Sequence, residues 1–211
     1  MPQSEMNFPS SDGPDFQHEL RLKERNIWPV AGLDEAGRGP LAGPVVAAAV
    51  ILDEDNIPEG LNDSKKLTEK RRKELYREIL GSSHVSFVCH SSKHIDQSNI
   101  LRASLEAMRK AVLALPIKPE YALVDGRDIP PNISVPSEAL IKGDARSLSI
   151  AAASIVAKVV RDHIMIRCAD VYPEYGFEKH AGYGTKFHRE AIHNCGPTPI
   201  HRMSFRPLRK D

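Results

Sequence analysis

One short stretch near the start of the chain restricts most strongly what this sequence can fold into. The apolar run Val30–Leu33 ends in two adjacent carboxylates, Asp34 and Glu35. A turn follows in which Gly37 and Gly39 flank an arginine. Adjacent side chains of a regular strand point to opposite faces of a sheet. We therefore expect a buried strand that ends before the two acids, because a backbone that turns at the glycines lets both acids serve one site.

Two further carboxylates are placed in a similar way. Tyr121–Asp125 is an apolar strand that runs into an acid and then a glycine, and Asp144 lies at or just before the first turn of the longest predicted helix, where it could cap free N–H groups. Sites in open α/β sheets gather outside the strand ends, so the four acids can converge. Four unpaired carboxylates favour Mg²⁺ or Mn²⁺. Two such ions about 4 Å apart would hold the attacking water and the leaving oxygen of a phosphodiester displacement.

Hydrophobic periodicity predicts the remaining elements. We expect helices over 16–25, from Thr68 to about Leu80, in one or two pieces within Ile95–Leu115, across the buried Ile150–Val160, and near Thr185–Asn194. We expect strands at Pro44–Leu52, as the hairpin partner of the first strand, at Val85–His90 and at Ala139–Lys142. This order predicts an α/β protein with a mixed sheet and helices packed against it.

The charge is unevenly distributed although the net charge is only +1. Residues 65–78 hold seven basic side chains against three acidic ones, and residues 161–211 hold nine against six. Acids flanked by bases would suit a metal centre framed by phosphate contacts. Solvated helix faces would give the same pattern, so charge alone leaves both interpretations open.

Composition and cysteine usage narrow the class of protein. Hydrophobic residues at 41% and charged residues at 27% are typical of soluble globular proteins, and no apolar stretch is long enough to span a bilayer. No signal-peptide pattern opens the chain, and Cys89, Cys168 and Cys195 have no close pairing spacing, so we expect reduced thiols and a cytoplasmic location. Cys168 and Cys195 with His188 and His193 fit no usual zinc pattern.

Six motifs together resemble those of the ribonuclease HII family. They are Asp34–Val45 (DEAGRGPLAGPV), Asp63–Lys65 (DSK), Val124–Gly126 (VDG), Lys142–Asp144 (KGD), Ala151–Val159 (AAASIVAKV) and Gly182–Thr185 (GYGT). The likeness runs from about Val30 to Phe205, and the first motif is highly specific to that family. Val160 departs from the threonine expected before Arg161, which could soften a local hydrogen bond.

The resemblance implies a fold, an activity and a set of partners. The fold is ribonuclease H-like, a mixed five-stranded sheet flanked by helices, with a catalytic domain at 16–170 and a small C-terminal helical extension at 171–211 that completes the substrate site. Residues 1–15, rich in Ser and Pro, are expected to be a disordered tail. The implied enzyme hydrolyses the RNA strand of RNA–DNA hybrids and cuts 5′ of single ribonucleotides embedded in duplex DNA, leaving 3′-hydroxyl and 5′-phosphate ends. We expect a monomer without membrane contact, and a sliding-clamp contact stays open.

The resemblance also assigns roles to individual residues. It implies that two Mg²⁺ or Mn²⁺ ions are bound by the catalytic acids Asp34, Glu35, Asp125 and Asp144. The backbone of Gly37, Arg38 and Gly39 would contact the ribonucleotide 2′-hydroxyl, which separates RNA from DNA. Tyr183 would stack on the sugar at the RNA–DNA junction, and Ser64 and Lys65 would lie near substrate phosphates.

Two other functions compete with this interpretation. One is another two-metal nuclease of the same fold, such as a junction resolvase, which would not need a turn that reads a 2′-hydroxyl together with Tyr183. The other is a catalytically silent nucleic-acid-binding module, which would not need four acids. Duplex DNA with one embedded ribonucleotide discriminates all three.

Overall fold

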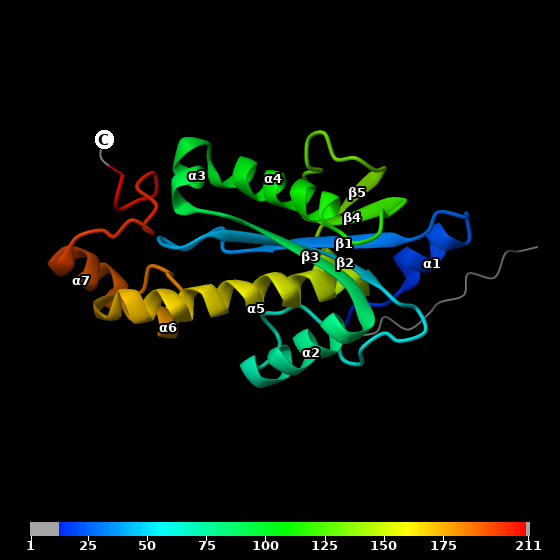
Figure 1. Ribbon diagram of the computed structural model, residues 1–211, viewed down its shortest axis with the longest axis horizontal. Helices are drawn as coiled ribbons and strands as arrows, with labels where there is room; N and C mark the ends of the chain where they lie inside the picture. Colours follow the sequence, from blue (N-terminus) through cyan, green and yellow to red (C-terminus); the bar gives the residue numbers. More distant parts are fainter. Residues whose placement is uncertain (1–12, 210–211) are drawn as a thin grey trace, which may run out of the picture.

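A computed structural model describes residues 13–209 and shows a mixed sheet between two layers of helices (Figure 1). The sheet has the strand order β3-β2-β1-β4-β5. Its strands are β1 (Val30–Ala36), β2 (Val45–Leu52), β3 (Ser83–His90), β4 (Tyr121–Asp125) and β5 (Ser137–Leu140). β1 pairs antiparallel with β2 and parallel with β4, which confirms both the predicted hairpin and the five-stranded mixed sheet.

Seven α-helices and two short 3₁₀ turns complete the described chain. They are α1 (Gln17–Lys23), α2 (Glu69–Ser82), α3 (Ser92–Gln97), α4 (Ile100–Leu113), η1 (Gly143–Ala145), α5 (Leu148–Val171), η2 (Pro173–Tyr175), α6 (Phe177–His180) and α7 (Lys186–Cys195). α5 and α2 cover one face of the sheet and α4 covers the other (Figure 1). Of the described helices, none is long and apolar enough to cross a membrane.

The central strand β2 explains how both faces are filled. All eight of its residues are buried. Val46 and Val50 pack in one core cluster with Ile155 of α5, whereas Ala47 packs in the other with Met108 of α4. This division follows from the alternation of side chains along a strand, and it makes β2 a continuously apolar segment.

Gly32 lets the long helix approach the sheet closely. A Cβ atom on Gly32 would lie 2.1 Å from the backbone carbon of Ser149, in the first turn of α5. No side chain can occupy that space, so the helix start is held directly against β1, two residues before Asp34.

Several predicted boundaries are corrected by the structure. The first strand does not end before the acids, because β1 continues to Ala36 through pairing with Val46 of β2. The short strand predicted at Ala139–Lys142 is β5 at Ser137–Leu140. The predicted tail 1–15 lies mostly outside the described residues, but Asp15 pairs as an isolated bridge with Ser147, so this residue belongs to the folded part and not to a disordered tail.

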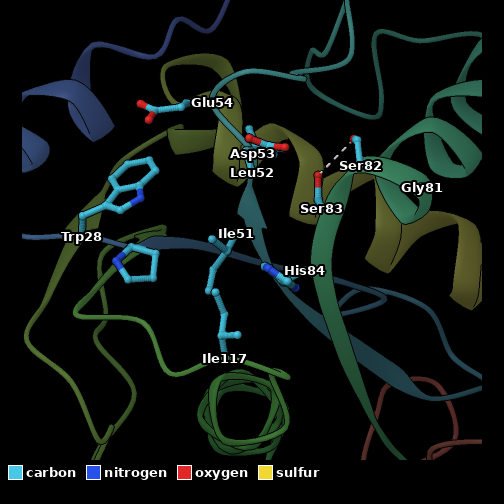
Figure 2. Close-up of a pocket in the computed structure, with 11 residues that line it drawn as sticks. Trp28, Ile51, Leu52, Asp53, Glu54, Gly81, Ser82, Ser83, His84 and Ile117 are labelled. Atoms are coloured by element: carbon cyan, nitrogen blue, oxygen red, sulfur yellow. Dashed lines mark hydrogen bonds between the residues drawn. The ribbon is translucent and has the colours of Figure 1, made fainter.

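The end of the sheet remote from the acids carries a separate hollow. Figure 2 shows Trp28, Ile51 and Ile117 among its lining residues, with Asp53 and Glu54 beside them. These residues precede β1 and β4 or lie at the end of β2, so strand register places them away from Asp34. The hollow therefore does not contribute to the site described below.

Candidate active site

Parallel pairing of β1 and β4 brings two of the predicted acids to one edge of the sheet. Leu33 pairs with Val124, so Asp34 and Asp125 follow on neighbouring strands. The Asp125 Oδ1 atom accepts a hydrogen bond of 2.7 Å from the Gly143 amide, which places η1 and therefore Asp144 beside it. The three strand and turn ends meet as predicted. Asp144 does not cap the long helix, however, because Ser147 accepts from the Ile150 amide in that role.

Glu35 joins this group from within a strand. The pairing of β1 with β4 stops at Leu33, whereas its pairing with β2 continues, so the β4 side of β1 is open beside Asp34 and Glu35. Burial raises the pKa of both carboxyls, and the negative charge of Asp125 contributes to raising each of them further. Asp34 and Glu35 therefore lie on a stretch of β1 that is unpaired on the β4 side, and not after the strand end that we had expected.

The electrostatics of the four acids favour bound cations. Burial, followed by the charges of Glu35 and Asp125, raises the pKa of Asp34 well above its ordinary value. Burial and the charge of Asp125 likewise raise the pKa of Asp144. Asp34 is only 5% exposed, so water can stabilise its charge very little.

Two basic side chains approach the acids. The Arg38 Nη1 atom lies 3.6 Å from Glu35 Oε1, and the Lys65 Nζ atom lies 4.0 Å from Asp144 Oδ2. Two positive charges beside four carboxyls leave an excess of negative charge and several carboxylate oxygens available as metal ligands. Such a donor set fits hard divalent cations such as Mg²⁺ or Mn²⁺.

A cleft beside the acids contains most of the predicted substrate residues. Its lining consists of Glu35, Ala36, Gly37, Arg38, Gly39, Ser64, Lys65, Ser154, Lys158, Arg161 and Tyr183. Tyr183 is 46% exposed, and a Cβ on Gly39 would lie 3.7 Å from its ring. Ser64 is buried at the cleft wall and its hydroxyl pairs with Ser154 at 2.8 Å. The structure therefore brings the predicted turn, Tyr183, Ser64 and Lys65 to one surface.

Two buried arginines that the sequence analysis did not single out hold the 37–39 turn. Arg202, fully buried, donates from Nη2 to the Gly37 carbonyl at 2.6 Å and from Nη1 to the Arg38 carbonyl at 3.0 Å. Arg161 of α5 donates to the Pro44 carbonyl at 3.0 Å. Gly37 has a φ of +98°, and a Cβ there would lie 2.1 Å from Arg161 Nε. Only glycine fits this position without displacing the arginine.

The direction of the peptide groups in this turn follows from Arg202. A trans peptide unit is planar, so its N–H points opposite to its carbonyl. The carbonyls of Gly37 and Arg38 point at the buried guanidinium of Arg202. The N–H groups of Arg38 and Gly39 consequently point away from it. The turn is thus built to offer amide donors to a ligand.

The C-terminal part of the chain completes the cleft through backbone contacts. The Leu41 amide donates to the Gly182 carbonyl at 2.8 Å, and the Arg202 amide donates to the Leu41 carbonyl at 2.8 Å. The Arg161 guanidinium lies 6.0 Å from the centre of the Tyr183 ring, within cation–π range. Tyr183 is therefore held beside the turn by residues from three separate segments.

A ribonuclease H-like sheet with carboxylates at one edge and a basic cleft beside them defines a metal-dependent nuclease. Comparison with known proteins gives the particular family. Residues 31–207 match the family model for ribonuclease HII. The chain is 61% identical over 199 residues to the ribonuclease HII of Agrobacterium fabrum strain C58, covering 94% of this chain and 92% of that protein. It is 59% identical to that of Rhizobium etli strain CIAT 652 over 197 residues, covering 93% and 86%.

A solved structure agrees with these sequence matches. Ribonuclease HII from Archaeoglobus fulgidus, determined in complex with PCNA, superposes with a TM-score of 0.73 at 31% identity, covering 86% of this chain and 97% of that one. The chain belongs to the ribonuclease HII family. It is a metal-dependent endonuclease that hydrolyses phosphodiester bonds with ribonuclease H activity on RNA–DNA, which decides against a catalytically silent binding module.

Proposed function

We propose that this enzyme cuts RNA–DNA hybrids and, in duplex DNA, cuts on the 5′ side of a single embedded ribonucleotide, leaving 3′-hydroxyl and 5′-phosphate ends. The observation that carries the proposal is the position of Tyr183 beside the 37–39 turn, in the same cleft as Glu35. A reader of the 2′-hydroxyl and a reader of the next sugar thereby lie next to the proposed catalytic acids. The enzyme would serve to remove ribonucleotides from DNA.

We propose that Asp34, Glu35, Asp125 and Asp144 hold two Mg²⁺ or Mn²⁺ ions. The support is their shared oxygen chemistry and the raised pKa values of Asp34, Glu35 and Asp144, which a divalent cation would relieve. When bound, the ions lower the pKa of water and stabilise the charge on the reacting phosphate. The carboxylates orient this centre at the edge of the sheet.

The protein's own groups select the bond. The N–H groups of Arg38 and Gly39, directed away from Arg202, would hydrogen-bond the 2′-hydroxyl. The exposed ring of Tyr183 would pack against the following deoxyribose. A 2′-hydroxyl on that second sugar would meet the ring, so a junction from RNA to DNA is the preferred substrate.

The C-terminal part 171–211 would act as an extension of the catalytic part 16–170. Its described residues supply Tyr183 and Arg202, both of which touch the turn or its neighbours. We propose a monomeric enzyme on this basis, because one chain supplies every group assigned to the site. The sliding-clamp contact stays a prediction, supported by the PCNA complex of the Archaeoglobus fulgidus relative.

Cleavage of defined duplexes tests this function. With Mg²⁺, we expect the enzyme to cut a DNA duplex that contains one ribonucleotide at a single position, 5′ to that ribonucleotide. An all-DNA duplex of the same sequence and a four-way DNA junction should stay intact. Mapping both new ends by mass spectrometry checks the polarity. Cleavage of the four-way junction without any ribonucleotide would instead support a resolvase.

A second prediction concerns Lys65, whose side chain is 79% exposed at the cleft. Burial lowers the pKa of the Lys65 amine, but the charges of Asp63, Asp34 and Asp144 raise it by more. The amine is therefore charged and available to a phosphate. Lys65→Ala should weaken substrate binding and flatten the slope of log K against log salt by about 0.9, the value for one phosphate contact on duplex DNA.

Lys118→Ala is the matched control for this measurement. Lys118 is an exposed lysine next to Ile117, at the remote end of the sheet, and its loss removes the same charge from the protein. Fluorescence anisotropy with catalytically inactive protein gives both slopes. Equal slopes for Lys65→Ala and Lys118→Ala would show that Lys65 contacts no substrate phosphate and is an ordinary solvated charge.

A further inference from the structure

A second group of possible metal ligands lies outside the candidate active site, where β3 leads into α3 and α4. It consists of His90 at the end of β3, His94 in α3 and Glu106 in α4. One ligand atom of each lies within 4.8 Å of the others, and within residues 13–209 this is the only group of three or more His, Cys, Asp or Glu side chains that meets this condition. The proposed nuclease chemistry uses none of these residues.

His90 is the member that indicates a ligand. It is only 8% exposed, and its Nε2 atom is buried without a hydrogen-bond partner among residues 13–209. That atom lies 4.0 Å from Glu106 Oε2, too far for a hydrogen bond. An unsatisfied buried polar atom destabilises a fold unless another partner binds it. A cation between His90 and Glu106 would provide that partner.

The ligand atoms of His94 and Glu106 lie close to the Nε2 atom of His90. His94 Nε2 donates to Glu106 Oε2 at 2.9 Å, and its ring stacks on that of His90 with centroids 4.0 Å apart and planes 16° apart. Lys110 Nζ lies 2.7 Å from the other carboxylate oxygen, Glu106 Oε1. Lys110 therefore occupies one oxygen and leaves Oε2 facing both histidines, which is how outer groups commonly orient a metal ligand.

We propose that His90, His94 and Glu106 bind one transition-metal ion of the Zn²⁺ type, with water in the fourth position. Two imidazole nitrogens and one carboxylate suit Zn²⁺, whereas Mg²⁺ prefers oxygen donors alone. The ion replaces the proton that His94 shares with Glu106.

The position of α3 links this site to the C-terminal segment. Ser92 Oγ donates to the Pro199 carbonyl at 3.2 Å, and the Asp96 carboxylate accepts from the amides of Met203 at 2.9 Å and Ser204 at 3.0 Å. Between these contacts lies Arg202, which holds the 37–39 turn. An ion that fastens His94 to β3 and α4 therefore also steadies α3 and the segment around Arg202.

Zinc titration of the full chain tests the site. We expect the metal-stripped protein in excess Mg²⁺, which competes at the four acids, to bind one Zn²⁺ ion from ZnCl₂. His94→Ala and Glu106→Gln should each weaken this binding at least about tenfold, the lower end of what even an outer-shell substitution costs. His84→Ala is the control, because His84 is an exposed histidine of the same strand as His90. Equal zinc affinities of the wild type and His94→Ala would overturn the proposal.

Hydrogen exchange provides a readout independent of stoichiometry and of nuclease activity. Zn²⁺ should slow exchange of the Met203 and Ser204 amides in the wild type and in His84→Ala, and should leave it unchanged in His94→Ala. This comparison keeps the test valid if His90→Ala, a change in a buried residue, fails to fold. Absence of any Zn²⁺ binding by the wild type in excess Mg²⁺ would refute the site outright.

Discussion

Replacing Asp34 by asparagine is expected to abolish cleavage while leaving the fold intact. Asparagine keeps the size of the side chain and an Oδ1 atom that can still accept from the Glu35 amide, a hydrogen bond of 2.6 Å. It removes a charged ligand from the proposed metal centre, which would stabilise the transition state more than the ground state. A loss of several kcal/mol of such stabilisation corresponds to roughly three or more orders of magnitude at about 1.36 kcal/mol per decade. Asp125→Asn should behave alike.

The same substitution should stabilise the protein in metal-free buffer. The pKa of Asp34 is raised in the folded state, so folding takes up protons, and the penalty for its charge grows as the pH rises from the unfolded pKa through the folded one. Asp34→Asn should therefore melt at a higher temperature than the wild type in EDTA at pH 7, and this advantage should disappear in acid below the unfolded pKa.

Steady-state cleavage, circular dichroism and thermal melting check these expectations together. Asp55→Asn is the matched control, because Asp55 is an exposed aspartate in the loop after β2, near the remote end of the sheet. It should change neither the rate nor the pH dependence of melting. Near-wild-type turnover by a folded Asp34→Asn enzyme would show that Asp34 is not a ligand of the proposed metal site.

Tyr183→Ala is expected to reduce cleavage at a single ribonucleotide by about one to two orders of magnitude. Removal of an aromatic ring that stacks on a nucleic acid costs about 1–3 kcal/mol, and we expect a similar value for a ring that packs on a sugar. About 1.36 kcal/mol equals one decade in rate. Uniform RNA–DNA hybrid should suffer less, because no deoxyribose follows the cut there. The comparison of kcat/KM on the two substrates measures this selectivity.

Tyr183→Phe separates the ring from its hydroxyl group. It keeps the surface that faces Gly39 and the cation–π partner of Arg161, so we expect activity close to the wild type on both substrates. Equal losses of Tyr183→Ala on both substrates would make Tyr183 a structural residue of the loop. A large loss for Tyr183→Phe would instead point to the hydroxyl.

Much of the architecture could be predicted because it is encoded locally. The continuous apolar run of β2, the start of α2 after Thr68 and the start of α7 near Thr185 can each be recognised within a few residues. The region Ile95–Leu115, predicted as one or two helices, is two, since Asn99 caps α4 after α3 has ended. Val160, where threonine was expected, packs in the apolar core.

The candidate acids could be identified from the sequence for a related reason. Asp34 and Asp125 each follow a short apolar run, and parallel strands carry such ends to one edge of a sheet. The resemblance of contiguous motifs to ribonuclease HII supplied the rest of the predicted set. Sequence alone thus determined which residue types meet, and which family of enzyme they serve.

Only the tertiary structure decided how these residues are held. β1 stops pairing with β4 at Leu33 but continues to pair with β2 as far as Ala36. No local pattern in Val30–Ala36 encodes this difference. Arg202 reaches the turn carbonyls across 165 positions of sequence, and His90, His94 and Glu106 meet only when α4 folds back over β3. Hydrogen bonds and charges act through space, so partners this distant in the chain become visible only once the chain has folded.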